Sequence, residues 1–122
     1  MSDSILRDKS KVFAKDIVFL CRSLKANKVE NVLINQLLKS GTSVGANVHE
    51  AQYAQGTKDF ISKFEIALKE CNESEYWLEL LYETNSISAN EFHKMQGMCV
   101  ELRRMLVATV TTIKSKQQTT GL

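Results

Sequence analysis

Apolar residues recur at steps of three, four and seven through four long segments, and this period constrains the fold more than any other feature of the chain. Such steps place the residues on one face of a helix. No proline occurs in the 122 residues, so no helix is forced to stop or kink by a missing backbone donor. The pattern predicts helices over residues 4–26, 28–54, 58–85 and 89–116, followed by a polar, frayed tail at 117–122.

The apolar face of each predicted helix is the expected core. Its members are Leu6, Phe13, Ile17, Leu20 and Leu24 in the first segment, Leu33, Leu37, Val44, Val48 and Ala51 in the second, Phe60, Phe64, Ala67, Cys71, Leu78 and Leu81 in the third, and Phe92, Met95, Cys99, Leu102, Leu106, Val110 and Ile113 in the fourth. Asn27 with Glu30, and Ser88 with Glu91, have the spacing of capping boxes, which predicts the starts of the second and fourth helices. Because short joints make neighbouring helices antiparallel, we expect residues 1–122 to form one all-α domain, an up-down-up-down four-helix bundle.

Composition and charge exclude several classes of protein. Hydrophobic residues are 43% and charged residues 25%, which is too apolar for a disordered chain. The apolar runs are too short to span a membrane, and the charged N-terminus lacks the apolar stretch of a secretory signal. Three cysteines, Cys21, Cys71 and Cys99, without a C-x-x-C pair, are typical of a reducing compartment. We therefore expect a cytoplasmic protein that does not associate with membranes.

The residues contain no recognisable catalytic or metal-binding motif. Neither His49 nor His93 follows a glutamate by three positions, as the di-metal sites of helical bundles require. No Gly-Lys-Ser/Thr follows Gly41 and Gly45, so a phosphate-binding loop is not indicated. A pair formed in space by Ser43 and His49 is a catalytic alternative that stays open. We expect no enzyme activity, no metal and no cofactor.

The second segment contains a run of residues that are unfavourable inside a helix, Ser40-Gly41-Thr42-Ser43-Val44-Gly45-Ala46-Asn47. Each glycine there costs about 1 kcal/mol relative to alanine. Gly41 and Gly45 share one face, however, where they allow another backbone to approach closely. A polar row lies beside the apolar face, at steps of four, three, four and three: Gln36, Ser40, Ser43, Asn47 and Glu50. Two interpretations stay open, a solvated flank beside a tight helix crossing or a face that contacts a subunit or ligand.

A second polar row occurs in the third segment, where Asp59, Lys63, Glu70 and Trp77 share one arc beside the core face and Glu73 lies at its edge. Tryptophans and paired charges at such a border often anchor packing or oligomer contacts. The alternative is a tryptophan that only covers the end of the bundle. The predicted oligomer or partner interface consists of Ser40, Gly41, Ser43, Gly45, Asn47 and Glu50 with Asp59, Lys63, Glu70, Glu73 and Trp77.

Charge is distributed unevenly, although the chain carries only +2 in total. Residues 4–26 hold six lysines and arginines against two aspartates, whereas residues 57–86 hold three lysines against seven carboxylates. Five cations lie opposite the core face of the first helix: Arg7, Lys11, Lys15, Arg22 and Lys25. This basic row can follow a phosphate backbone, but the solvated face of an ordinary helix has the same composition.

The block from Ser40 to Ala51 is specific enough to suggest a family. Together with Asp59-Phe60-Ile61, Lys63, the run from Ile66 to Glu70 and Glu73-Ser74-x-Tyr76-Trp77-Leu78, it resembles the bacterial four helix bundle protein family. That family includes proteins encoded in intervening sequences of 23S ribosomal RNA genes, often labelled ribosomal-protein-like. More distantly, the chain is similar to the accessory variability determinant of diversity-generating retroelements, which lacks this block.

The resemblance implies an antiparallel bundle that assembles as a homopentamer, with RNA or a nucleic-acid enzyme as partner and with no catalytic residue. Asn47, Glu50, Lys63, Glu70 and Trp77 match the polar motif of the family. We therefore predict a non-enzymatic, homo-oligomeric, RNA-associated accessory protein. The alternative is a protein–protein adaptor whose basic row is only solvated. The least favoured hypothesis is an enzyme or small-ligand binder that uses the polar row.

Overall fold

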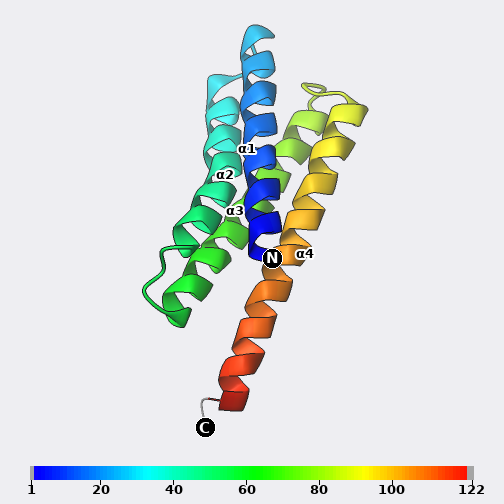
Figure 1. Ribbon diagram of the computed structural model, residues 1–122. Coiled ribbons are helices and arrows are strands. Elements are labelled where there is room, and N and C mark those ends of the chain that lie inside the picture. Colours follow the sequence, from blue (N-terminus) through cyan, green and yellow to red (C-terminus); the bar gives the residue numbers. More distant parts are fainter. Residues whose placement is uncertain (1, 121–122) are drawn as a thin grey trace.

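The computed structural model describes residues 2–120, with side chains from 5 to 117, and this part of the chain contains four helices and no strand. The helices are α1 (Ser2–Ala26), α2 (Asn31–Ala51), α3 (Thr57–Glu83) and α4 (Ala89–Thr120), which run alternately up and down (Figure 1). The predicted all-α four-helix bundle is confirmed. None of the helices described is both long and apolar enough to cross a membrane.

The joint between α1 and α2 differs from the prediction. Lys28 has a left-handed backbone, with φ of 60°, and the Val29 amide donates to the Leu24 carbonyl at 3.0 Å. This is the 6→1 hydrogen bond of a Schellman motif, which ends α1. Glu30 then precedes α2 without a side-chain cap bond. The predicted capping box of Asn27 and Glu30 is therefore wrong, and α2 begins three residues later than expected.

The capping box at the start of α4 is confirmed. The Ser88 hydroxyl accepts a hydrogen bond from the Glu91 amide at 3.1 Å, and the Glu91 carboxylate accepts one from the Ser88 amide at 3.1 Å. At its other end α4 continues through Thr120. The tail that we expected to be frayed is therefore helical from 117 to 120, whereas 121–122 lie outside the described residues.

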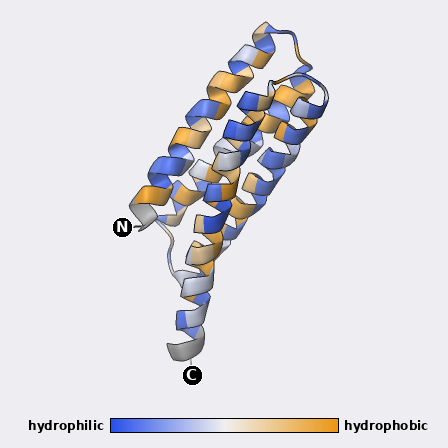
Figure 2. Cartoon of the chain, turned by 90° about the vertical axis from the view of Figure 1, so that its right-hand side faces the viewer, coloured by the Kyte–Doolittle hydropathy of each residue, from blue (hydrophilic) through white to orange (hydrophobic). Residues whose placement is uncertain are grey.

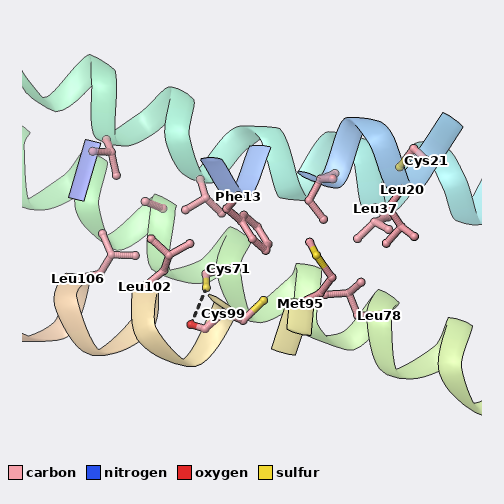
Figure 3. Packing of buried hydrophobic residues seen from close by; sticks show 14 of the residues in the cluster. Phe13, Leu20, Cys21, Leu37, Cys71, Leu78, Met95, Cys99, Leu102 and Leu106 are labelled. Atoms are coloured by element: carbon pink, nitrogen blue, oxygen red, sulfur yellow. Dashed lines mark hydrogen bonds between the residues drawn. The ribbon is translucent and has the colours of Figure 1, made fainter. Parts of the chain in front are cut away.

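The predicted apolar faces meet in one core along the bundle (Figure 3). Only Leu33, Phe60 and Ile113 of the predicted members are partly buried, and the others are buried. Figure 2 shows hydrophobic and hydrophilic positions alternating around the helices, as an amphipathic pattern requires. Burial raises the pKa of the Cys21 thiol to about 11, so this cysteine behaves as a small apolar side chain at neutral pH.

The helices follow one another around the bundle, and α1 and α4 share the smallest contact between neighbours. Two ion pairs cross it, Lys9 Nζ to Glu101 Oε1 at 3.3 Å and Lys94 Nζ to Asp16 Oδ2 at 3.6 Å. The C-terminal end of α4 extends past the other helices (Figure 1). In this order α2 lies between α1 and α3. One flank of α2 therefore borders the contact with α1, and the other flank borders the contact with α3.

Candidate nucleic-acid interface and polar seam

The two glycines of α2 face α1 of the same chain. A methyl group built on Gly41 would come within 2.7 Å of Ile17 Cγ1, and one on Gly45 within 3.2 Å of the Ser10 carbonyl oxygen. Only a residue without a Cβ lets α1 approach this closely. The close approach predicted from the glycine spacing is confirmed, and tight packing within the chain offsets the helix propensity that these glycines lose.

Ser40 points into the bundle toward α3. It is 0% exposed; its hydroxyl accepts from the Ser74 hydroxyl at 3.0 Å and donates to the Leu37 carbonyl at 3.3 Å. Gly41 is buried as well. Ser40 and Gly41, which we predicted at an interface with another subunit or partner, are thus covered by α3 and α1 of the same chain.

The other polar residues of α2 and α3 flank the contact between these two helices, on the side of the Ser40–Ser74 bond. We call this surface the polar seam. Its members are Gln36, Ser43, Asn47 and Glu50 of α2 and Asp59, Lys63, Glu70, Glu73 and Trp77 of α3. Glu50 is exposed and the others are partly buried. The two polar rows predicted separately therefore border one helix contact.

Hydrogen bonds within each helix orient several side chains of the polar seam. The Asn47 amide donates to the Ser43 carbonyl at 2.9 Å and to its hydroxyl at 3.1 Å. The Trp77 indole donates to Glu73 Oε2 at 3.2 Å, and its ring packs edge-on against Tyr76 with centroids 5.0 Å apart. Part of this surface is thus ordered before any partner binds.

Helix direction determines which seam residues lie level with one another. α2 and α3 are antiparallel, and Ser40 of α2 lies opposite Ser74 of α3. Seven residues after Ser40 and seven residues before Ser74, Asn47 therefore lies opposite Ala67, which is between Lys63 and Glu70 in the sequence. The Asn47 amide therefore lies opposite the stretch of α3 between an ammonium and a carboxylate, each about one helical turn from Ala67. A mixture of this kind suits a complementary polar surface on a protein partner.

The basic row of α1 borders a groove of about 1040 Å³ between α1 and α2. Four of its five members line the groove, Arg7, Lys11, Lys15 and Arg22, whereas Lys25 does not. Apolar side chains also line the groove, among them Val12, Val18 and Ala46, and two carboxylates, Asp8 and Glu50, lie in the lining as well. The groove therefore combines positive charge with apolar surface.

The cations of the basic row are exposed. Among the described side chains, no carboxylate lies within 4 Å of the Lys11, Lys15 or Lys25 ammonium. Lys9, on the side of α1 that faces α4, is by contrast paired with Glu101 at 3.3 Å. The Lys11 and Lys15 ammonium groups beside the groove are consequently free of the ion pairs that would weaken their attraction for an anion.

The sequence analysis missed an exposed apolar row on α1. Ile5, Val12 and Phe19 are 51%, 48% and 62% exposed and recur at steps of seven. That spacing keeps them on one side of the helix, away from the core face, and is a signal that the sequence contains. Val12 and Phe19 also line the groove. The exposed face of α1 is thus partly apolar and not only basic.

Comparison with known proteins agrees with the architecture. Residues 2–108 match the family described as 23S rRNA-intervening sequence protein. The chain belongs to this family. It is similar to a solved protein of unknown function from the S23 ribosomal protein family of Bacteroides thetaiotaomicron VPI-5482, with 43% identity and a TM-score of 0.88 over 91% of this chain and 99% of that one. No curated protein matches.

In this member of the family, Ser43 and His49 do not form the pair that the sequence left open. The Ser43 hydroxyl accepts from Asn47 in the polar seam, whereas His49 lines the groove on the other flank of α2 and packs against Tyr53. Across the described residues, no three His, Cys, Asp or Glu side chains are grouped so that they could hold a metal ion. The surfaces with functional potential are therefore the groove and the polar seam.

Proposed function

We propose that this protein is a non-enzymatic, cytoplasmic accessory protein that forms a homo-oligomer and binds RNA along the groove between α1 and α2. The observation that carries RNA binding is the basic row. From Arg7 to Arg22, four exposed cations line one groove over about 22 Å of helix. The family description, which refers to 23S rRNA, supports the same class of partner.

Local charge, not net charge, would drive this binding. The chain carries only +2, and its excess of carboxylates lies on α3, which is diagonal to α1 in the bundle. Each cation that meets a phosphate releases condensed counterions, so affinity falls steeply as salt rises. Contacts of this type position a nucleic acid without reading its sequence. We therefore expect binding that is strongly salt-dependent and not sequence-specific.

The test is filter binding of RNA at two salt concentrations. Wild type should retain RNA at low salt and lose it at high salt. The triple variant Lys11→Glu, Lys15→Glu, Arg22→Glu should retain none, because the groove then repels phosphate. All three side chains are exposed, so helicity and oligomer mass should stay as in wild type.

A matched control separates the position of the charges from their number. Lys58, Lys69 and Arg104 are also exposed but lie on α3 and α4, and reversing them to Glu changes the net charge by the same amount. This control should retain RNA nearly as wild type does. Equal losses in both triple variants would contradict the groove as the site. Retention by the groove variant, or none by wild type, would contradict RNA binding there.

A protein–protein adaptor is the second candidate. It is favoured by large apolar side chains exposed away from the groove: Val32 is 71% exposed and Tyr76 56%. Isolated surface residues of this kind are common on monomers, so we rank the adaptor below RNA binding. The filter-binding experiment distinguishes the two, because an adaptor retains no RNA at either salt concentration.

The homo-oligomer is the part of the proposal that rests on the polar seam. Its mixed amide, ammonium, carboxylate and indole groups are half-buried and partly ordered by their own hydrogen bonds. A symmetric assembly would repeat such a surface in every subunit. In a closed ring, the basic row would also be repeated, and weak phosphate contacts would add through multivalency.

A further inference from the structure

Building on the proposed RNA binding, we infer that the groove takes single-stranded RNA in preference to duplex, with a base stacked on Phe19. The Phe19 side chain is 62% exposed, so it contributes little to packing in the core of the bundle. Phe19 lies at the groove, and the Arg22 guanidinium lies 5.8 Å from its ring centroid. Aromatic rings and arginine planes are the groups on which unpaired bases stack.

The charges around Phe19 determine which groove the RNA backbone follows. The same ring borders a smaller groove between α1 and α4, where Asp16 and Glu91 are part of the lining. The smaller groove also contains Lys94, which pairs with Asp16 at 3.6 Å, so its lining carries two carboxylates against one cation. The α1–α2 groove is lined by four cations against Asp8 and Glu50, and its excess of positive charge attracts phosphate. The backbone therefore follows the α1–α2 groove, and a base turns toward Phe19 at the edge between the two grooves.

The apolar part of the lining favours unpaired nucleotides. A duplex keeps its bases stacked inside and presents phosphates and base edges, which gain nothing from Val12, Val18 or Ala46. An unpaired base has an apolar face that can cover these side chains while its phosphate stays beside a lysine. The combination of cations and apolar surface is therefore matched to a single strand.

An aromatic pair, His49 and Tyr53, lies toward the end of the groove opposite Phe19. His49 is one helical turn beyond the contact of Gly45 with Ser10, and its ring lies 5.5 Å from that of Tyr53, which is 74% exposed. His49 also lines the groove. A strand that lies along the basic row would thus find a ring near each end, which extends the stacking surface beyond one nucleotide.

The experiment measures fluorescence anisotropy with a labelled, unstructured oligouridine and with a labelled RNA duplex of the same length. Wild type should bind the single strand more tightly. Phe19→Ala should weaken binding of the single strand about tenfold, the size of a lost base–aromatic contact, and leave duplex binding unchanged. Phe19→Tyr should restore it. Val107→Ala, which removes an exposed apolar side chain from α4 outside the groove and the polar seam, should have no effect.

The salt dependence adds a readout that a structural defect would not reproduce. Phe19 meets no phosphate, so Phe19→Ala should keep the wild-type salt slope, whereas removing groove cations should reduce it. If the groove triple variant loses RNA while Phe19→Ala binds as wild type, or if duplex binds at least as tightly, the single-strand inference is overturned and the proposed function stands. If wild type binds neither RNA, both are overturned.

Discussion

Gly41 and Gly97 both lie inside helices, yet their surroundings are opposite. A methyl group on Gly41 would meet Ile17 Cγ1 at 2.7 Å, whereas one on Gly97 would meet nothing within 4 Å. Replacing either with alanine gains the same helix propensity, about 1 kcal/mol. The difference between the two variants therefore isolates the cost of crowding a rigid core position.

Gly41→Ala should be less stable than Gly97→Ala by about 1–3 kcal/mol, which is the usual cost of overpacking. Gly97→Ala should exceed wild type by up to about 1 kcal/mol. Urea unfolding followed by circular dichroism gives both free energies of unfolding. Equal stability of the two variants would show that Ile17 moves aside without cost and that the crossing of α1 and α2 does not need glycine.

These residues also show how far a sequence pattern reaches. The four-residue spacing of Gly41 and Gly45 identified a face and a close approach, but a spacing does not identify the neighbouring helix. Ser40 looked like part of a surface row, because its partner Ser74 lies 34 positions away and only the fold brings the two together. Phe19 was not singled out, although its seven-residue spacing from Val12 was visible.

At the scale of helices, the periodicity predicted all four elements, and the errors lie at their ends. The start of α2 was misplaced because Lys28 adopts positive φ, for which lysine gives no sequence signal. Asn85 adopts the same conformation after α3, where asparagine is an expected residue. The capping box at Ser88 was predictable because both of its hydrogen bonds join residues three positions apart.

The contact of α2 with α3 should contain a measurable coupling between Ser40 and Ser74. Each hydroxyl keeps a backbone acceptor when the other is removed, Leu37 O for Ser40 and Glu70 O for Ser74. A double-mutant cycle with alanine should therefore give a coupling of only about 0.5–1.5 kcal/mol.

The cycle is again read from urea unfolding. Ser62→Ala makes the same chemical change at an exposed position of α3 and should stay within about 0.5 kcal/mol of wild type. Additive effects of the two buried substitutions would contradict the coupling and would leave the hydroxyls as independent bonds to their own helices.

At the scale of the whole molecule, the sequence of an exposed row of residues does not reveal whether water or another subunit covers it. The bundle was predictable because burying four apolar faces in one chain has few solutions. Assembly depends on a second surface, the one between subunits, and the spacing of apolar residues in the sequence does not specify where that surface lies. The polar seam is the candidate here, since it borders one helix contact yet leaves Glu50 exposed and eight other polar or aromatic residues half-buried.

We expect a homopentamer in solution, with a mass of about 69 kDa by light scattering, five times the 13.8 kDa of one chain. Glu50→Lys reverses an exposed charge at the edge of the polar seam, where the side chain also lines the groove, and should shift the mass toward that of the monomer, because the reversed charge would no longer complement the surface that it contacts in the assembly. Glu79→Lys makes the same change at an exposed position of α3 outside the seam and should leave the mass unchanged. Both variants should keep wild-type helicity, since neither side chain packs in the core. A monomer mass for wild type at micromolar concentration would end the oligomer hypothesis, whereas a pentamer that Glu50→Lys does not disturb would place the interface away from the polar seam.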